Sequence, residues 1–329
     1  LELKKVYEPV ETKAEELKSG KLKIWNKFDF LSLEDILLHG EVVADGQILW
    51  ETEQRLEGIG PGSEKRLELK GLREIVEELE KGPDHWLNLE YRARTKTSFA
   101  EKGHTLATAQ FLLNKGTERR TRELGGRLQL REAGPLVTIT GEDFRVTFDS
   151  VRGKLTGYEK DGMEKLRSGP ELDLWRSPID NDMYLLKDYK EKYFIDLLHE
   201  VVEHFEWEQA ANHIRVYCQT TAGTTNSAWH YRMAYDYKIL PEGHIRISIK
   251  GEPSGLVENA PVMLPRIGVR MRTAKELENV SWYGRGPGES YPDSKESAFF
   301  GIHGKKVREM FTHYIRPQEN GSRSETSWL

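Results

Sequence analysis

The stretch that indicates the fold class most directly is WHYRMAYDYKILPEGHIRISI, Trp229 to Ile249. Aromatic and aliphatic residues alternate with charged and polar ones on both sides of Pro241-Glu242-Gly243. This two-residue period is typical of a β-strand with one buried face, so the stretch predicts a hairpin with long arms. Long arms that carry wide aromatic side chains favour a large two-sheet sandwich over a small barrel.

The chain before this hairpin continues the β pattern. Alternating apolar residues between Val137 and Phe148 predict further strands, and Arg152-Gly153-Lys154 and Lys160-Asp161-Gly162 have the composition of turns. One set of apolar residues has helical spacing instead and predicts a surface helix: Leu186, Tyr189, Tyr193 and Leu197.

The first third of the chain also predicts short strands. Asp45-Gly46 lies between two extended segments and predicts a hairpin, because a tight primed turn needs residues that tolerate positive φ. The stretch HWLNLEYRAR, His85 to Arg94, alternates as a strand with one solvated face. Apolar residues between Leu72 and Leu79 have helical spacing and predict one short helix. The whole segment suits a β-sandwich of immunoglobulin type.

Between these two regions the composition changes to KGTERRTRELGGRLQLREAG, Lys115 to Gly134. Polar, charged and glycine-containing segments of this kind connect domains. The sequence therefore predicts a sandwich at 1–117, a linker at 118–131 and a second β domain at 132–329.

Bulk composition excludes several classes of protein. The net charge of -5 comes from 54 acidic and 49 basic residues that are mixed along the chain, so neither nucleic acid nor a membrane is an expected partner. The only cysteine, Cys218, excludes an intrachain disulfide and favours a reducing compartment, so we expect a cytoplasmic protein. The start LELKKVYEPV has neither an initiator Met nor a signal-peptide core, and the chain is expected to be part of something longer.

Three polar clusters could carry function. In WRSPIDND, Trp175 to Asp182, the carboxylates of Asp180 and Asp182 could bind a cation or sugar hydroxyls, or they could cap the following helix. In YIRPQENGSRSET, Tyr314 to Thr326, amide and carboxylate groups could hold a polyol or could satisfy the hydrogen bonds of a loop.

The third cluster is SWYGRGPGESYPDSKESAFF, Ser281 to Phe300, whose glycines and prolines predict a contorted and rigid loop. Glu289 and Asp293 could form an acid–base pair. The loop places them across Pro292, and the sequence favours salt bridges to Arg285 and Lys295.

No known catalytic motif occurs in the sequence. Of ten histidines only His199 and His204 are close together, and their spacing of five does not match a zinc helix. Nucleophile-elbow, P-loop and dinucleotide-binding motifs are missing. The eight tryptophans could form a sugar-stacking platform, although aromatic residues mostly fill the cores of β-sandwiches.

Together the three clusters carry a family resemblance. LDLWRSPIDND, WYGRGPGESYPDS and YIRPQENGSR, in this order, resemble the C-terminal domain of bacterial β-galactosidases of glycoside hydrolase family 2. The stretches YEPVETKAEELKSGKLKIWNKFDFLSLEDILLHGEVVADG and TSFAEKGHTLATAQFLL resemble the immunoglobulin-like domain that precedes it. The resemblance implies an all-β chain, an immunoglobulin-like sandwich followed by a galactose mutarotase-like β-supersandwich. The second domain is expected to be incomplete and to expose sheet edges, because the last domain of the family normally runs further.

The same resemblance implies a function. Family members hydrolyse terminal β-D-galactosides such as lactose with retention, using two glutamates on a (β/α)₈ barrel. No such barrel is in this chain, so no residue here is expected to be catalytic and the chain alone is predicted to be inactive. Its implied role is to brace and complete the active site of a barrel domain or subunit in a homo-oligomer. An independent carbohydrate-binding module and an interaction subunit acting in trans remain alternatives.

Only a few residues take a role from the resemblance. Asn181 and Asp182, with the segment 183–188, are expected to lie near the substrate. The other matched positions are expected to be structural: Trp175, Pro178, Gly286, Pro287, Glu289, Tyr291, Pro292, Asp293, Glu319, Asn320 and Gly321. No cofactor is expected in this chain, whereas Mg²⁺ and Na⁺ are expected only for a whole enzyme. Some relatives bind sodium at the position of Arg316 and Pro317, where Arg316 replaces an aromatic residue, and Trp328 does not match the family's active-site tryptophan.

Overall fold

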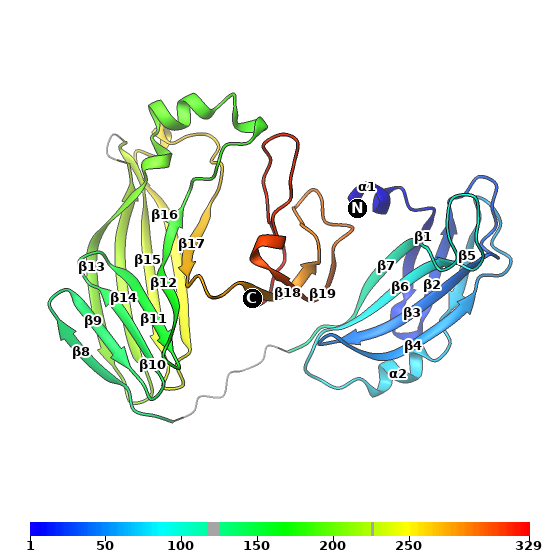
Figure 1. Ribbon diagram of the computed structural model, residues 1–329, viewed down its shortest axis with the longest axis horizontal. Coiled ribbons are helices and arrows are strands. Elements are labelled where there is room, and N and C mark those ends of the chain that lie inside the picture. The colour runs from blue at the N-terminus through cyan, green and yellow to red at the C-terminus, as the bar shows by residue number, and fades with distance from the viewer. Residues whose placement is uncertain (118–124, 225–226) are drawn as a thin grey trace. The chain divides into compact units, whose positions relative to one another are not determined.

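A computed structural model describes residues 1–117, 125–224 and 227–329, which form two compact units (Figure 1). The first contains the described residues before the gap at 118–124, together with Asn279–Thr312 and Asn320–Leu329. The second contains the residues from that gap to Glu278, together with His313–Glu319. Half of the predicted linker, residues 118–124, lies outside the described residues. Within the described chain, no helix has the length and apolar character needed to cross a bilayer.

The N-terminal part of the first unit contains two antiparallel sheets, with one short helix before the first strand and another between the fifth and sixth strands. The sheets have the orders β1-β2-β5 and β4-β3-β6-β7. Their elements are α1 (Glu2–Val6), β1 (Val10–Glu16), η1 (Leu17–Ser19), β2 (Lys21–Asn26), β3 (Ile36–Ala44), β4 (Gln47–Arg55), β5 (Glu64–Glu68), α2 (Leu72–Glu78), β6 (His85–Ala93) and β7 (Thr105–Asn114). Leucine, isoleucine and valine side chains from both sheets form one buried core between them. This is the predicted immunoglobulin-like sandwich.

Local sequence signals in this unit are confirmed. Asp45 and Gly46 have φ values of 48° and 77° and connect β3 to β4, as a primed turn requires. Along β6, every second residue is buried, from His85 to Ala93. The predicted helix between Leu72 and Leu79 is α2.

The second unit is a larger sandwich of two antiparallel sheets, with the orders β17-β12-β11-β10-β9-β8 and β13-β14-β15-β16. Its strands are β8 (Gln129–Ala133), β9 (Leu136–Thr140), β10 (Phe144–Asp149), β11 (Lys154–Lys160), β12 (Met163–Asp173), β13 (His199–Gln209), β14 (Ile214–Gly223), β15 (Trp229–Ile239), β16 (Ile245–Gly255) and β17 (Gly268–Thr273). The predicted long-armed hairpin is β15–β16, and its aromatic residues Tyr235 and Tyr237 lie in the core between the two sheets.

The surface helix predicted between Leu186 and Leu197 forms only in part. Residues 186–192 are helical and include the π turn η3 (Asp188–Lys192), and a separate turn, η4 (Ile195–Leu197), follows. The turn η2 (Asp180–Asp182) precedes them. Phe194 has a φ of 53°, which is the left-handed region, and this interrupts any continuous right-handed helix between η3 and η4.

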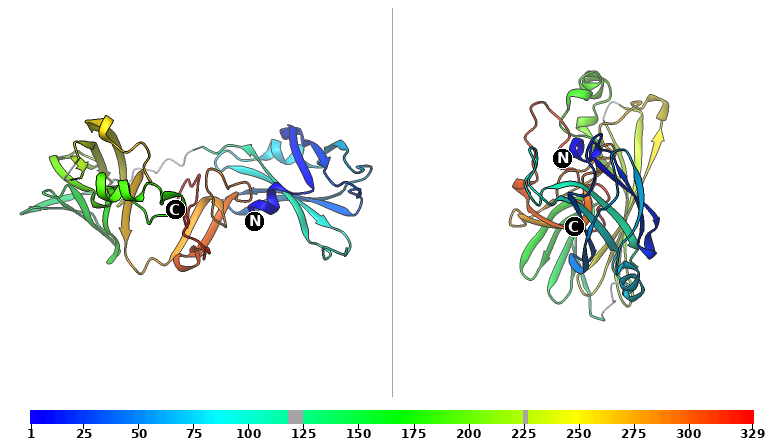
Figure 2. Two further views of the ribbon diagram at one scale, coloured as in Figure 1. Left: turned by 90° about the horizontal axis from the view of Figure 1, so that it is seen from above. Right: turned by 90° about the vertical axis from the view of Figure 1, so that its right-hand side faces the viewer.

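The second domain predicted at 132–329 differs from the compact units. The hairpin of β18 (Asn279–Gly286) and β19 (Phe299–Lys306), orange in Figure 2, belongs to the first unit. Trp86 stacks on Phe300 with ring centroids 4.6 Å apart. Tyr283 donates a hydrogen bond to Asp84 at 2.7 Å and accepts one from the indole of Trp86 at 2.8 Å. These contacts join the hairpin to residues of the first sandwich. The remaining short turns are η5 (Val257–Asn259) and η6 (Val307–Glu309).

Gly153 is a tightly packed turn position beside the second core. Its φ is 61°, and a methyl group on it would lie 2.5 Å from Cys218 Sγ and 2.7 Å from Val202 Cγ2. Cys218 itself is buried, and that burial raises the pKa of its thiol to about 12. A side chain at residue 153 therefore meets both backbone strain and a packed interior.

We expect Gly153→Ala to destabilise the second unit by about 2–5 kcal/mol, since about 1–2 kcal/mol comes from the positive φ and about 1–3 kcal/mol from overpacking. Gly162→Ala is the matched control, because Gly162 has a φ of 70° and nothing within 4 Å of the added methyl. Urea unfolding followed by tryptophan fluorescence measures both variants. Equal losses of stability would show that the clash with Cys218 is relieved at no cost.

Candidate functional site

The WRSPIDND cluster follows directly after β12 and is held by Arg176. The guanidinium of Arg176 lies 3.1 Å from both carboxylate oxygens of Asp182, which is a bidentate pair. Asp182 is 8% exposed and also accepts a hydrogen bond from the backbone N–H of Ile179 at 2.9 Å. Asp182 therefore closes the turn η2 and neutralises Arg176, and its two oxygens are committed to the protein.

Arg176 also joins this turn to the segment that contains Glu319. Arg176 Nε lies 3.0 Å from Glu319 Oε2 and donates to the carbonyl of Pro265 at 2.8 Å. Arg266 bridges Glu319 at 3.0 Å and Asp173 at 3.2 Å. Two arginines and three carboxylates thus connect three separate parts of the chain. We call these five residues the arginine cluster: Asp173, Arg176, Asp182, Arg266 and Glu319.

The arginine cluster brings together one expected substrate-proximal residue and one expected structural residue, Asp182 and Glu319. Three of its members were missed from the sequence: Asp173, Arg176 and Arg266. Arg176 stood inside a motif singled out for its acids, and an arginine between an aromatic residue and a proline, close to several acids, is the signal that could have found it.

The segment after Asp182 is exposed and held in place by backbone hydrogen bonds. Tyr184 is 93% exposed and Met183 60% exposed. The N–H of Leu185 donates to Asp182 O at 2.9 Å, and the N–H of Tyr189 donates to Leu185 O at 2.9 Å. A tyrosine and a methionine are therefore presented to solvent next to the rigid arginine cluster.

Asp180, Asn181 and Pro317 lie at the rim of the same cluster. Asn181 is exposed, and the N–H of Asp180 donates to the carbonyl of Pro317 at 3.1 Å. Arg316, which is largely exposed, places its guanidinium 3.8 Å from Asp180. A positive charge beside the Pro317 carbonyl does not fit a sodium site at Arg316 and Pro317. Among the described residues, no group of three or more His, Cys, Asp or Glu side chains could hold a metal ion.

Apart from Glu319, the expected structural residues of the other two motifs lie in the first unit. Glu289 accepts a hydrogen bond from the N–H of Gly321, and the buried Ser290 donates its N–H to Ser322 O at 3.0 Å. The loop around Gly286 and Pro287 is thus tied to the C-terminal segment. Trp282 on β18 is fully buried, the guanidinium of Arg323 from this segment lies over its ring at 5.3 Å, and its indole donates to Arg285 O at 3.0 Å.

Pro292 and Asp293 form the tip of a tight turn in which Tyr291 and Ser294 exchange two backbone hydrogen bonds. Asn320 accepts from the N–H of Thr312 at 3.0 Å and donates to its carbonyl. These residues shape loops, and Asp293 itself is exposed.

The salt bridges predicted for Glu289 and Asp293 are wrong. Arg285 and Lys295 both pair with Glu325 instead, Arg285 at 3.0 Å. The hydrogen bond from Lys295 lowers the pKa of Glu325, and Arg285 acts in the same direction. The physical reason is that the C-terminal segment pairs antiparallel with β18, with Trp328 opposite Tyr283, and brings Glu325 to these two bases, which sequence spacing does not show.

The structure therefore divides the predicted site residues between the two units. Trp175, Pro178, Asn181, Asp182 and Glu319 belong to the second unit, and the matched residues from Gly286 to Asp293, with Asn320 and Gly321, belong to the first. Each group is tightly hydrogen-bonded within its own unit. An all-β protein of two sandwich-based units, with loop clusters of paired charges and no recognisable catalytic set among its described residues, is the class that fold and site define.

Comparison with known proteins identifies the family. Residues 140–329 match the family described as Beta galactosidase small chain, and residues 22–114 match beta-galactosidase domain 4. The chain belongs to the beta-galactosidase small chain family, with a beta-galactosidase domain 4 on its N-terminal side.

Individual relatives agree with this assignment. The beta-galactosidase of Priestia megaterium is 27% identical over 99% of this chain and 31% of that protein. The beta-galactosidase of Lactobacillus delbrueckii subsp. bulgaricus is 27% identical over 95% and 30%, and that of Kluyveromyces lactis 26% identical over 100% and 30%. The chain spans about a third of the length of the curated relatives it matches.

Removing the Arg176 guanidinium should destabilise the second unit strongly. Arg176→Met leaves the buried carboxylate of Asp182 without its bidentate partner, and breaking a buried pair costs about 3–5 kcal/mol. Arg167→Met is the matched control, since its pair with Glu164 has both side chains about half exposed, and it should change little. Urea unfolding measures the stability of both variants, and hydrogen exchange of residues 179–188 shows whether the turn beside Asp182 opens. Similar stability of the two variants would contradict the assigned importance of Arg176.

His303 should give the first unit a pH-dependent stability. Burial lowers the pKa of His303 below its ordinary value of 6.5, and the charges of Arg323 and Lys305 act in the same direction. Its ring lies 5.4 Å from that of Trp282, and Nε2 is 3.1 Å from Phe299 O. Because the unfolded chain binds the proton more readily, stability from this group is complete above pH about 6.5 and is lost as the pH falls from there toward the lower folded pKa.

We therefore expect His303→Gln to flatten the fall in stability between pH about 6.5 and 5, as measured by urea midpoints across that range. Exposed His104→Gln serves as the control and should leave the slope as in the parent protein. An unchanged slope in His303→Gln would exclude His303 as the titrating group.

Proposed function

We propose that this chain is the non-catalytic C-terminal part of a retaining β-galactosidase, which braces and completes the active site of a separate (β/α)₈ barrel. The observation that supports this most is the arginine cluster beside the exposed segment Met183–Asp188. Exposed aromatic and thioether side chains on a rigid cluster are typical of a surface that contacts another protein. Anchoring residues of this kind bind tightly because they lose little conformational entropy on binding.

The charges of the cluster argue for positioning and not for acid–base chemistry. Asp173, Asp182 and Glu319 each lie within 3.2 Å of an arginine nitrogen. Carboxylates engaged in this way hold the loops together, whereas a glycosidase needs two carboxyl groups that flank the scissile bond. The hydrolysis of a terminal β-D-galactoside would therefore use glutamates outside this chain. Asn181 and Asp182, with the exposed segment, would border the substrate.

An interaction subunit acting in trans is a second candidate. The matched family carries the description of a small chain, which favours a separate polypeptide that assembles with a larger one. An independent carbohydrate-binding module has less support, because Trp25, Trp207 and Trp328, the most exposed tryptophans, come from different elements and Trp207 is engaged by Glu132.

Further properties of the whole enzyme follow from this proposal. Its partner would be the barrel domain or subunit, and the assembled protein would be a cytoplasmic homo-oligomer. Any Mg²⁺ or Na⁺ would be bound by residues outside this chain.

A chimeric enzyme tests the proposal directly. Replacing the matching segment of the Priestia megaterium beta-galactosidase with these 329 residues should give an enzyme that turns over o-nitrophenyl β-galactoside, while the 329-residue chain alone should show no turnover. Tyr184→Ala should lower the activity of the chimera about tenfold, as expected for an interface anchor. Tyr7→Ala, at a tyrosine 77% exposed in the first unit, is the control and should leave activity unchanged. Turnover by the chain alone would overturn the proposal.

A further inference from the structure

The sequence contains a single Asn-Gly step, Asn320-Gly321, in the motif YIRPQENGSRSET. Asparagine is one of the chemically labile residues. It loses its side-chain amide fastest before glycine, because glycine has no side chain to shield the backbone nitrogen that attacks. Both residues are half-buried in the structure, so water reaches them. The sequence alone therefore makes this step the first expected position of deamidation.

Deamidation joins two groups of this step. The nitrogen of Gly321 loses its proton and attacks Cγ of Asn320, so that a new C–N bond forms, the bond from Cγ to Nδ2 breaks and ammonia leaves. Water then opens the resulting succinimide at either carbonyl group and gives aspartate or isoaspartate. The net reaction consumes one water and releases one ammonia, so it needs no other reactant.

The amide group that must react is held at both of its polar atoms. Asn320 Oδ1 accepts the N–H of Thr312 at 3.0 Å, and Nδ2 donates to the carbonyl of the same residue. During the attack Cγ becomes tetrahedral, and Nδ2 departs afterwards. Both changes break the planar pair of hydrogen bonds to Thr312, which adds to the barrier of the reaction.

The attacking nitrogen is held as well. The N–H of Gly321 donates to the carboxylate of Glu289. Loss of this proton would place an amide anion against a carboxylate, and a neighbouring negative charge disfavours the formation of a second one. Ser290 ties the same two segments together, because its N–H donates to Ser322 O at 3.0 Å and its hydroxyl accepts the N–H of Ser324 at 2.8 Å.

We propose that Asn320 is a deamidation site that the native loop keeps closed, so that it reacts only while the loop is open and the loop cannot close again afterwards. The closed loop restrains both reacting groups, whereas an open loop leaves an ordinary Asn-Gly step. After the reaction, a carboxylate oxygen replaces Nδ2 opposite the Thr312 carbonyl. Two acceptors then face each other without a proton between them, which destabilises the closed form.

The consequence for the chain follows from where this bond pair lies. The chain leaves the first unit after Thr312 and returns to it at Asn320, so the two hydrogen bonds close the base of the segment His313–Glu319. Isoaspartate also adds one carbon to the main chain directly after Glu319, a member of the arginine cluster. Deamidation therefore loosens the segment that holds Glu319 in position.

Peptide mapping by mass spectrometry tests the proposal on the 329-residue chain at mildly alkaline pH. We expect Asn320 in the folded chain to deamidate about tenfold or more slowly than in the synthetic peptide YIRPQENGSRSET, because only the open fraction of the loop reacts. Equal rates in the chain and the peptide would overturn the inference.

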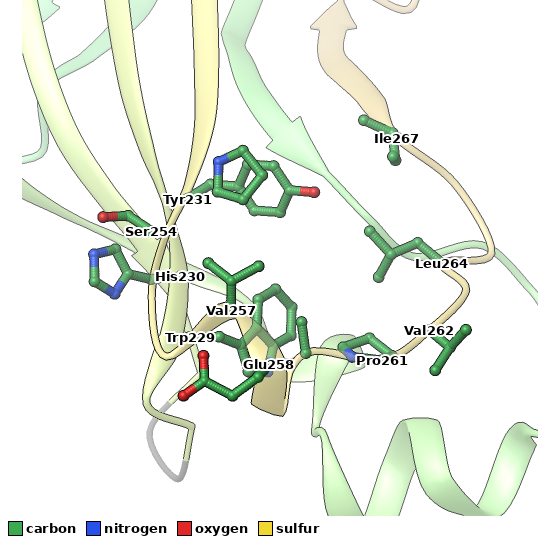
Figure 3. Close-up of a pocket in the computed structure, with 12 residues that line it drawn as sticks. Trp229, His230, Tyr231, Ser254, Val257, Glu258, Pro261, Val262, Leu264 and Ile267 are labelled. Atoms are coloured by element: carbon green, nitrogen blue, oxygen red, sulfur yellow. The ribbon is translucent and has the colours of Figure 1, made fainter.

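A second Asn-Gly step in the same chain provides an internal reference. Ala260→Gly creates it at Asn259, an exposed residue in the loop that carries Glu258 and Pro261 beside the cavity in Figure 3. The backbone N–H of Ala260 donates to the carbonyl of Val257 at 3.0 Å, which is a neutral acceptor. We expect Asn259 to deamidate about tenfold faster than Asn320 in this variant, and a slower reaction at Asn259 would count against the proposal.

Variants of Glu289 test the restraint on the attacking nitrogen. Glu289→Ala should speed the deamidation of Asn320 about tenfold, because it removes both the acceptor and the charge. Glu289→Gln keeps an acceptor and the size of the side chain, so it should speed the reaction less. Asp293→Ala, at an exposed carboxylate in the same loop, is the matched control and should react as the parent protein does. Parent-like rates in both Glu289 variants would refute the restraint.

Hydrogen exchange protects the test against misfolding of a variant. In the parent protein, the deamidation rate of Asn320 and the exchange rate of the Gly321 amide should rise together when low concentrations of urea open the loop. Asn320→Asp carries the charge of the product and should speed exchange of residues 313–319, whereas Asn259→Asp at the exposed site should not. Parent-like exchange of residues 313–319 in Asn320→Asp would show that the loop closes after the reaction, against the proposal.

Discussion

The ion pair between Arg176 and Asp182 is the interaction on which the loops of the second unit depend. A guanidinium offers five N–H donors in one plane, and here they reach a turn, a backbone carbonyl and a distant carboxylate at the same time. Arg266, which bridges Asp173 and Glu319, links the same three parts of the chain a second time. Because both partners are mostly buried, losing either one would leave a charge that solvent cannot neutralise cheaply.

In the first unit, aromatic and amide contacts hold a peripheral hairpin in place. The hairpin β18–β19 is attached through the stack of Trp86 on Phe300 and through the amide of Gln110, which bonds both the N–H and the carbonyl of Phe300. Tyr283 adds a directional pair of hydrogen bonds. The ring stack buries apolar area, and the hydrogen bonds fix the position of the hairpin along the strands it contacts. Together they stabilise a hairpin of only two strands, whose stability in isolation is marginal.

The sequence predicted what is local and missed what is tertiary. Alternation along Trp229–Ile249 and His85–Arg94 predicted strands correctly, because side chains of a strand point to opposite faces whatever its neighbours are. The helix expected between Leu186 and Leu197 ends early, because a helical apolar spacing says nothing about a residue such as Phe194, which adopts positive φ. The predictions of which charged side chains pair with one another were wrong. Glu325 lies 30 residues from Lys295 with which it pairs, and Arg266 lies even further from Asp173. Such pairs depend on how distant loops pack against one another, and no periodic pattern in a single sequence reveals this packing.

The arginine cluster and the exposed segment beside it, 183–188, have opposite physical characters. In the cluster, charges neutralise one another within the unit, so its geometry is complete without a partner. In the segment, the side chains of Met183 and Tyr184 stay in water, although the burial of apolar area is favourable. Under the proposed function these characters are complementary. The exposed segment would supply association energy, because burying apolar area is non-directional, and the cluster would supply orientation, because its turn presents Tyr184 in one geometry. A bracing part of an enzyme needs both: affinity without orientation would not shape an active site, and orientation without affinity would not hold it there.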